Sequence, residues 1–316
     1  MNEYDAAVQE HNRLVANDEP ANPFKHLGEG NSYAVFTDKF NPDLLEPISR
    51  KDGRALHGIY DSSMVGVDVL TCHEATFLTD SGCPIAGTVK FVYDASTPFM
   101  VESKSAKLYF NSFDMCRMGP DVGTAAMAYE KQLSKDLSAC VGGRVRVAFY
   151  ASTEFNAWPK TNLLTGYRDI LSEVPDVDKI HFDDFSGQKS HITLNPSGGV
   201  VQFFTNALRS RCRHTKQKDT GLAAIYHHSN HGTIDPLSAF KQIVSLREVN
   251  EFHEFCAEKL FVEMTKATDM NDDIMVMLLY SRRGSLDINP VRATSYELIP
   301  DALQNVSELT LKVQGQ

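Results

Sequence analysis

An order of strands, then helices, then one closing strand occurs twice along this chain of 316 residues. In the first half, residues 67–71 and 87–93 have strand composition, and residues 79–82 between them are typical of a turn. Residues 121–143 have the three- and four-residue apolar spacing of a helix, and residues 144–150 alternate as a strand does.

The second half repeats this order. Residues 198–204 and 221–226 have strand composition. An Asp-Pro pair, a good helix start, opens a helical run over residues 235–266 that is interrupted near Asn250. Residues 274–280 close the pattern as a strand.

The repeated order predicts an α+β fold made of two similar modules, each an antiparallel sheet backed by helices. We expect three segments. Residues 1–60, rich in Asn, Asp, Pro and Gly, form an extended arm with short turns, and residues 61–155 form the first module. Residues 156–316 contain a linker, up to about residue 195, and the second module.

The charge balance argues against a nucleic-acid partner. Acidic residues outnumber basic ones 41 to 31, which gives a formal net charge of -10. Proteins that bind a duplex or tRNA usually present a basic face. One local basic stretch, residues 209–218, remains inside the acidic total.

The chain has the composition of a cytoplasmic protein. Residues 1–19 are polar and charged, so we expect no signal peptide, and no apolar run approaches the roughly twenty residues that cross a bilayer. The six cysteines are scattered and include no Cys-x-x-Cys pair. This usage predicts reduced thiols in the cytoplasm.

A candidate nucleophile and proton donor lie seven residues apart in one basic loop, as Cys212 and Asp219. Nearby Arg, Lys and His side chains stabilise a thiolate and lower the pKa of a cysteine, and this is the most cationic cysteine environment in the chain. A cysteine in a basic loop and an aspartate in a turn also occur without any function, so that alternative stays open.

Cys83 is a second candidate, in a turn between two predicted strands. The residue seven positions after it is Lys90, which cannot replace the carboxylate of Asp219. We therefore interpret Cys83 as structural.

Zinc chemistry is the main rival, because Cys212 is followed by several histidines. His227 and His231 have a spacing seen in zinc sites, but the residues between them predict a turn rather than one helix face. His253 lacks the second histidine of a zinc protease motif. We expect no catalytic metal. The chain also lacks a Gly-x-Gly-x-x-Gly fingerprint and a P-loop, so a nucleotide must bind outside a Rossmann unit.

Two further segments have bland interpretations when each is taken alone. Residues 252–254 (Phe-His-Glu) could be a core aromatic beside a solvated pair, and residues 102–109, with Glu102, Lys104 and Lys107, could be a charged edge.

Taken together with the Cys212 loop, these segments resemble the bimodular NADPH-dependent 7-cyano-7-deazaguanine reductases, the nitrile reductases of the queuosine pathway of tRNA modification. The likeness runs from about residue 41 to residue 292. The matching segments, in order, are residues 102–113, 136–140, 234–236, 243–245, 250–254 and 282–290.

The resemblance implies a role for each matched residue. Cys212 matches the nucleophile, Asp219 the general acid and His253 a second proton-handling group. The residues expected to bind substrate are Glu102, Ser103, Phe252 and Glu254, with Phe252 packing on the heterocycle. The weaker candidates for the phosphates of NADPH are Lys104, Lys107 and Arg283.

The resemblance also implies two tandem tunnelling-fold modules, a homodimer and NADPH as the cofactor. The residue types suit the chemistry independently. A thiolate can attack a nitrile carbon while a carboxylic acid protonates the nitrogen, which gives a thioimidate. Hydride then reduces this to an imine and finally to an amine. The N–H groups of a deazaguanine require acceptors such as carboxylates.

The chain departs from the family pattern at two positions beside the reactive pair. Arg213 replaces the usual proline and Thr220 the usual tryptophan, and residues 227–232 suggest a small insertion. Two alternatives therefore remain. One is a relative that forms an amidine from the same thioimidate, and the other is a deazaguanine-binding protein without catalysis.

Overall fold

The computed structural model describes residues 39–59, 64–174, 176–213 and 215–311. The chain separates into two units, residues 1–36 and 37–316, and only the second contains described residues. The predicted arm therefore lies mostly outside the described residues.

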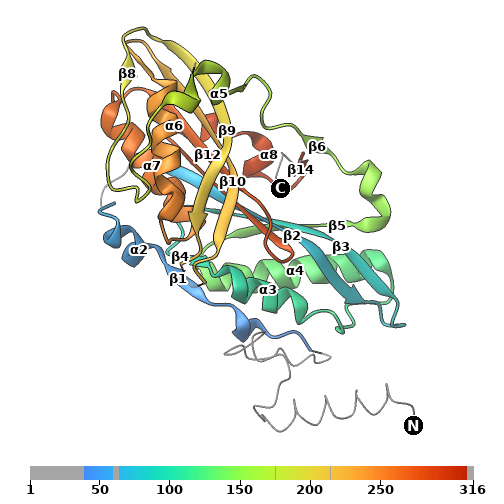
Figure 1. Ribbon diagram of the computed structural model, residues 1–316. Coiled ribbons are helices and arrows are strands. Elements are labelled where there is room, and N and C mark those ends of the chain that lie inside the picture. Colours follow the sequence, from blue (N-terminus) through green and yellow to red (C-terminus); the bar gives the residue numbers. More distant parts are fainter. Residues whose placement is uncertain (1–38, 60–63, 175, 214, 312–316) are drawn as a thin grey trace, which may run out of the picture. The chain divides into compact units, whose positions relative to one another are not determined.

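An eight-stranded sheet forms the centre of this unit, in the order β5-β3-β2-β13-β12-β10-β9-β7 (Figure 1). Its neighbouring strands are antiparallel, except that β7 runs parallel to β9. The strands are β2 (Val65–Leu78), β3 (Pro84–Asp94), β5 (Val145–Ala151), β7 (Arg168–Asp169), β9 (Gly199–Arg211), β10 (Lys218–Ser229), β12 (Asp273–Tyr280) and β13 (Leu286–Ala293).

Three two-stranded pairings lie outside this sheet, and all six strands in them are short. They are β1 (Pro47–Ser49) with β4 (Phe99–Val101), β8 (Leu194–Asn195) with β11 (Thr233–Ile234), and β6 (Lys160–Thr161) with β14 (Leu309–Thr310).

The α-helices vary from single turns to twenty residues. They are α2 (Arg50–Leu56), α3 (Ser103–Asn111), α4 (Val122–Val141), α5 (Ile170–Glu173), α6 (Pro236–Val244), α7 (His253–Ala267) and α8 (Asp301–Gln304). Short 3-10 turns occupy η1 (Pro42–Leu44), η2 (Ser152–Ala157), η3 (Val177–Lys179), η4 (Ser245–Glu248) and η5 (Tyr296–Leu298).

The predicted α+β architecture is confirmed, and the predicted order of strands, helices and strand is present in both halves. The helix predicted over 121–143 spans α4, and Gly142 ends it in the left-handed conformation with φ 70°. Asp235 caps α6 as expected, because its carboxylate accepts the backbone N–H of Ser238 at 2.8 Å. The boundaries 1–60, 61–155 and 156–316 stay predictions.

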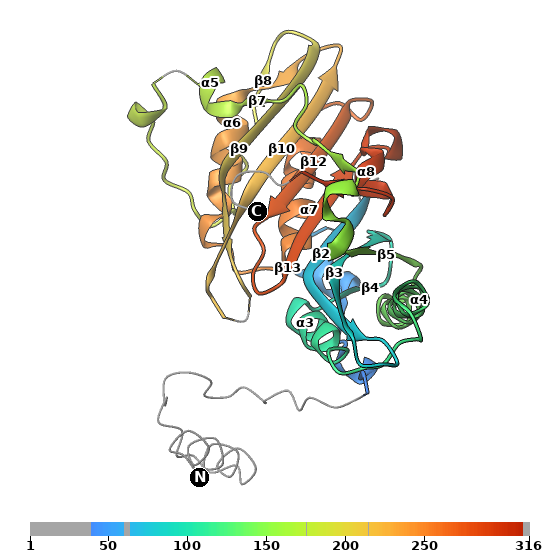
Figure 2. The ribbon, with the colours of Figure 1, turned by 90° about the vertical axis from the view of Figure 1, so that its right-hand side faces the viewer.

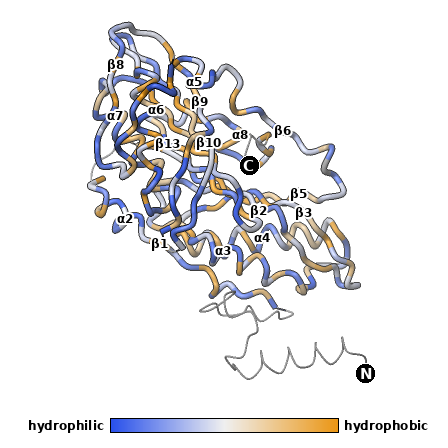
Figure 3. Tube along the Cα trace, viewed as in Figure 1, coloured by the Kyte–Doolittle hydropathy of each residue, from blue (hydrophilic) through white to orange (hydrophobic). Residues whose placement is uncertain are grey.

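The four long helices pack on one face of the sheet. Helices α3 and α4 lie along β2 and β3, whereas α6 and α7 lie along β9, β10 and β12 (Figures 1 and 2). Alternate strand residues such as Leu70 and Val276 enter these two cores. The opposite face packs against residues near Leu163 and Leu303. Figure 3 shows that hydrophobic positions are concentrated in the strands and helices.

Strand β13 joins the two halves, and this strand was not predicted. It pairs with β2 over eight consecutive positions, from Leu286 opposite Cys72 to Ala293 opposite Val65. On its other side it pairs with β12. The two predicted sheets are therefore parts of one continuous sheet.

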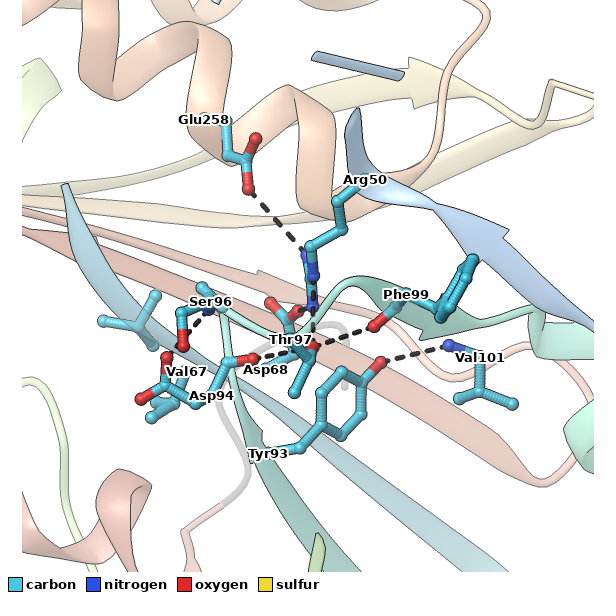
Figure 4. A network of polar contacts seen from close by, with 12 residues as sticks. Arg50, Val67, Asp68, Tyr93, Asp94, Ser96, Thr97, Phe99, Val101 and Glu258 are labelled. Atoms are coloured by element: carbon cyan, nitrogen blue, oxygen red, sulfur yellow. Dashed lines mark hydrogen bonds and ion pairs between the residues drawn. The ribbon is translucent and has the colours of Figure 1, made fainter. Parts of the chain in front are cut away.

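A buried polar seam separates the two helix-side cores. Asp68 on β2 and Arg292 on β13 pair at 2.8 Å, and Arg292 also contacts Glu258 of α7 at 3.1 Å. Figure 4 shows Arg50 of α2 reaching both carboxylates, Asp68 and Glu258. Arg54, one turn later, holds Glu258 with two hydrogen bonds of 2.8 Å. Helix α2 thus ties residues before the first module to the second half.

Candidate active site

One pocket brings together all ten residues singled out in the sequence. It lies where the starts of α3 and α7 meet the tip of the β9–β10 hairpin and the segment 281–288. It encloses about 640 Å³ of empty space, its open mouth included. The predicted residues that line it are Glu102, Ser103, Lys104, Lys107, Cys212, Asp219, Phe252, His253, Glu254 and Arg283. The role of each remains a prediction.

The hairpin tip holds Cys212 in a closed turn. The backbone N–H of Cys212 donates to the carbonyl of Gln217 at 2.9 Å, and the N–H of Lys216 donates to the carbonyl of Cys212 at 3.0 Å. Beyond this turn, Asp219 of β10 is directly opposite Ser210 of β9. Residues directly opposite in an antiparallel pair point to the same face, so Asp219 shares the helix-covered face with Ser210.

Asp219 is 4% exposed and contacts an imidazole and a guanidinium. One carboxylate oxygen lies 3.4 Å from Nε2 of His253, and the other accepts a hydrogen bond from Arg283. Burial opposes ionisation, but the hydrogen bond and charge of His253, followed by those of Arg283, hold the pKa of Asp219 below its ordinary value. Asp219 is therefore a carboxylate in the resting site, able to accept the proton of a neighbouring thiol.

His253 is fixed by stacking. Its ring lies on the ring of Tyr280, with centroids 3.7 Å apart and planes 7° apart. Nδ1 of His253 is buried and has no hydrogen-bond partner among the described residues. The imidazole can therefore exchange a proton with Asp219 at Nε2, while Nδ1 is shielded from the pocket.

Arg283 is already engaged within the protein. Its guanidinium donates to Asp219 and to the side-chain oxygen of Gln217. Although burial favours its neutral form, the hydrogen bond and charge of Asp219 raise the pKa of Arg283, and Cys212 adds to this effect. Lys107 lies in the same electrostatic environment. Burial and the charge of Arg283 lower its pKa, whereas Glu102 is the largest opposing influence.

The N-terminus of α3 contributes Glu102 and Ser103. Glu102 caps this helix, because one carboxylate oxygen accepts the N–H of Ser105 at 2.7 Å. The other oxygen lies 3.4 Å from the hydroxyl of Ser103. The cap fixes the Glu102 carboxylate at the pocket wall, while Lys104 in the first turn is exposed.

Glu254 is a buried carboxylate at the floor of the pocket, only 2% exposed. Burial, with a second contribution from the charge of Asp68, raises its pKa to about 8. The positive charges of Arg50 and Arg292 reduce this shift without cancelling it. Glu254 is therefore mostly neutral at pH 7 in the ligand-free protein and becomes a better acceptor when it loses its proton.

The described residues contain no group of three or more His, Cys, Asp or Glu side chains arranged to hold a metal ion. His227, one of the possible zinc ligands, instead contacts Asp272 at 3.2 Å through Nε2 and accepts the N–H of Ile234 through Nδ1. His214 lies outside the described residues. In the described part of the chain, no helix combines the length and the apolar character of a membrane span.

Sequence comparison identifies relatives over most of the chain. A family model described as nitrile reductase, 7-cyano-7-deazaguanine-reductase N-term, matches residues 36–149. An NADPH-dependent 7-cyano-7-deazaguanine reductase of Psychrobacter cryohalolentis is 30% identical over 290 residues, 86% of this chain and 95% of the relative. Proteins of the same name from Azoarcus sp. and Chromobacterium violaceum are 32% and 33% identical, over 87% and 84% of this chain and 93% and 90% of their own.

The chain belongs to the family of NADPH-dependent 7-cyano-7-deazaguanine reductases. The resemblance inferred from the ordered motifs is thereby confirmed.

Arg213, which stands where the pattern of this reductase family has proline, makes side-chain contacts that a proline could not make. Its guanidinium lies 3.1 Å from Glu251 and 5.9 Å from the ring centroid of Phe252. Glu251 in turn accepts the N–H of Phe252 at 2.9 Å and contacts His57 at 2.9 Å. The loop that lacks the reductases' proline is therefore tied to the start of α7 by an ion pair.

Glu251, which lines the pocket, and its partner His57 are residues that the sequence interpretation missed. Glu251 directly precedes the Phe-His-Glu motif, so its position in the chain was a usable signal. His57 lies 194 residues away from its partner, and nothing in its local sequence indicates the contact. At the second substituted position, the hydroxyl of Thr220 lies 3.5 Å from that of Ser281, at the pocket rim.

Proposed function

We propose that this protein reduces the nitrile of 7-cyano-7-deazaguanine to 7-aminomethyl-7-deazaguanine, with NADPH as the reductant. The observation that carries the proposal is the convergence of a thiol, an ionised carboxylate, an imidazole and buried carboxylates on one pocket of a family member. A concave site that combines apolar side chains, here Val101, Leu286 and Ile288, with convergent polar groups is typical of small-molecule binding.

The first step is addition of Cys212 to the nitrile. Asp219, a carboxylate at rest, takes the thiol proton, and the sulfur then forms a bond to the nitrile carbon. The same proton passes from Asp219 to the nitrile nitrogen, so the product is a neutral thioimidate. The pairing of Asp219 with His253 and Arg283 supports this role, because it keeps the carboxylate ionised before substrate binds.

NADPH, when bound, supplies hydride for both reduction stages. Asp219 and His253 supply and remove protons as the Cys212 thiolate departs and the nitrogen becomes an amine. Lys104 and Lys107, at the pocket wall, are cations that can contact this cofactor. The engagement of Arg283 with Asp219 makes Arg283 less suited to that task.

Recognition of the heterocycle is assigned to Phe252, Glu254 and the α3 start. Phe252 offers its ring as a packing surface, and the guanidinium of Arg213 lies 5.9 Å from the centroid of this ring. Glu254 and Glu102 accept N–H groups of the deazaguanine, and Ser103 adds a hydroxyl. Each acceptor is fixed by a helix start, which favours a preorganised site.

We also propose two tunnelling-fold modules, residues 61–155 and 156–316, that share this single site within a homodimer. The outermost strands of the sheet, β5 and β7, support dimer formation because open edges can pair with a second copy. None of the six cysteines forms a disulfide, which supports a cytoplasmic location. The proposed product supports a place in queuosine synthesis.

The direct test mixes protein, 7-cyano-7-deazaguanine and NADPH and follows the nicotinamide absorbance, with mass spectrometry of the protein in parallel. We expect NADPH loss of two equivalents per nitrile and a Cys212 adduct when NADPH is omitted. A stable adduct without NADPH loss would refute reduction and favour amidine formation. Neither signal would favour a binding protein without catalysis.

A further inference from the structure

A second pocket lies on the β9–β10 hairpin, beside the catalytic tip. Five cations line it: Arg209, Arg211, Lys216, Lys218 and Arg247. It contains about 780 Å³ of empty space, its open mouth included. This pocket accounts for the basic stretch that the sequence placed inside an otherwise acidic chain.

The strand register turns this pocket away from the catalytic one. Lys218 is directly opposite Arg211, one position from the Asp219–Ser210 pair. Because successive strand residues point to opposite faces, Lys218 and Arg211 project away from the face that carries Asp219. Arg209, two residues before Arg211, shares their face. One hairpin therefore presents acid–base groups on one face and cations on the other.

The two pockets differ in charge balance. Four carboxylates and four Lys or Arg side chains line the catalytic pocket, and two of those cations, Arg213 and Arg283, are already paired with Glu251 and Asp219. In the hairpin pocket the single lining carboxylate, Glu248, pairs with Arg211 at 3.1 Å. The described residues provide no ion-pair partner for the other four cations, so positive charge is in surplus here.

Two residues of this pocket carry an energetic cost in the ligand-free protein. Nε of Arg209 is buried without a hydrogen-bond partner among the described residues, which is unfavourable for a charged donor. Lys216 has φ 58°, in the left-handed region that favours glycine. A lysine there places a cation at the tip at some cost in backbone strain.

We propose that the hairpin pocket binds the phosphate-bearing adenosine end of NADPH, while the nicotinamide serves the catalytic pocket on the other face. This inference rests on the proposed function. Five cations and one carboxylate leave a formal surplus of four positive charges, and the pyrophosphate and 2′-phosphate together carry about four negative charges at neutral pH. Phe185, partly exposed at this pocket, offers a ring on which the adenine can stack.

The test measures binding rather than turnover. The ligands are adenosine 2′,5′-bisphosphate, which has no nicotinamide, and NADP⁺ and NAD⁺, each added to the full-length protein in a calorimeter. Wild-type protein is expected to bind the bisphosphate and to prefer NADP⁺ over NAD⁺. The double variant Arg209→Gln, Lys218→Gln is expected to bind both phosphate ligands at least tenfold more weakly and to lose the preference.

Two further variants separate this effect from misfolding and from bulk charge. Lys216→Gly removes a cation and relaxes a strained backbone, so affinity for the bisphosphate should fall while the melting temperature stays equal or rises. The double variant Lys131→Gln, Arg144→Gln removes the same charge from exposed positions elsewhere and should bind like wild type.

The Cys212 adduct, formed with 7-cyano-7-deazaguanine alone, distinguishes failure of the hairpin-pocket proposal from failure of the proposed function. If the adduct forms but the Arg209 and Lys218 variant binds NADP⁺ within twofold of wild type, the hairpin pocket is not the phosphate site. Loss of binding only in a Lys104→Gln, Lys107→Gln variant would assign the phosphates to the catalytic pocket. Tight binding of a single-stranded oligonucleotide without bisphosphate binding would also overturn the proposal, in favour of nucleic acid.

Discussion

Two hairpin tips in the same sheet each carry a cysteine, and one of these cysteines, Cys212, lines the catalytic pocket. Cys83, at the tip between β2 and β3, is exposed, whereas Cys212, between β9 and β10, is half-buried in the catalytic pocket. The residues seven positions after the two cysteines differ in chemical type. Asp219 is an ionised carboxylate, but Lys90 is a buried amine that donates to the backbone carbonyls of Ala302 and Glu308.

This difference shows that the reactivity of a tip comes from what surrounds it. The Cys212 tip meets the starts of two helices from different halves of the chain, together with Arg283. The Cys83 tip is held by its own backbone, where the N–H of Thr79 donates to the carbonyl of Cys83 at 2.9 Å, and by the segment 116–119, where the carbonyl of Gly119 accepts the N–H of Asp80 at 2.7 Å. A hairpin cysteine becomes a candidate nucleophile only where other segments of the chain supply its acid–base and binding partners.

The largest expected effect follows removal of each thiol in turn. Cys212→Ala should abolish the adduct and lower turnover on the order of 10⁴-fold, because no other group at the tip can form the bond to carbon. Cys83→Ala should leave both unchanged. Steady-state kinetics and intact-protein mass spectrometry make the comparison. Turnover by Cys212→Ala at close to the wild-type rate would refute the mechanism.

Substitution of the residue seven positions after each cysteine, Asp219 or Lys90, gives the next largest effect. Asp219→Asn should lower kcat by roughly 10²- to 10³-fold, because the amide cannot relay the thiol proton. Lys90→Met, at the matching position of the other hairpin, should change the melting temperature and leave kcat intact. Equal losses of kcat in the two variants would indicate a folding defect rather than a proton relay.

A pH dependence should distinguish the reactive tip, since only this tip faces Glu254. The pKa of about 8 in the free protein lies above the ordinary value, and substrate N–H groups favour the carboxylate. Binding below pH 8 therefore releases a proton, so affinity for 7-cyano-7-deazaguanine should rise from pH 6 to 8 and level off above. In Glu254→Gln, affinity should be about tenfold weaker at pH 8 and nearly flat with pH.

Calorimetry in two buffers of different ionisation enthalpy measures the released proton directly. Relative to wild type, the ligand-free Glu254→Gln variant should become more stable to unfolding as pH rises. Burial disfavours the ionised Glu254, and a glutamine has no charge to bury. A wild-type affinity that falls between pH 6 and 8 would contradict the assignment of Glu254 as an acceptor.

The smallest expected effect concerns the backbone of the inactive tip. Gly82 has φ 87°, and an added Cβ would meet the side chain of Arg117 only at ordinary contact distance. Gly82→Ala should therefore cost about 1 kcal/mol of unfolding free energy from the backbone alone. Urea denaturation measures this, and kcat should not change. A loss of activity would indicate that the two tips communicate.

Much of the central sheet and its covering helices could be predicted because the long strands other than β13, and helices α4, α6 and α7, have clear local patterns. Strand β13 was missed for a physical reason. It contains Pro290, which lacks an N–H and normally argues against a central strand, and it buries the polar Asp287 and Arg292. Helix α2 contains Gly53, which fits closely beneath the ring of Phe255 and gives no helical signal in the sequence.

The residues that form the site were easier to predict than the contacts between them. The family resemblance, carried by local motifs, identified the ten residues that now line one pocket. The Asp219–Arg283 and Arg213–Glu251 contacts depend on how distant segments fold together, so spacing alone could not indicate them. Sequence reasoning accordingly gave Arg283 to the cofactor, whereas the fold engages it with Asp219.

The pairing of β13 with β2 has a consequence for dividing the chain. If the chain were cut between β5 and β7, the first fragment would expose the edge of β2, and the second would expose the edge of β13. Each fragment would carry eight residues of unpaired backbone with a matching apolar face. The fragments would be a natural split pair, able to recombine through the missing strand interface and prone to aggregate when kept apart.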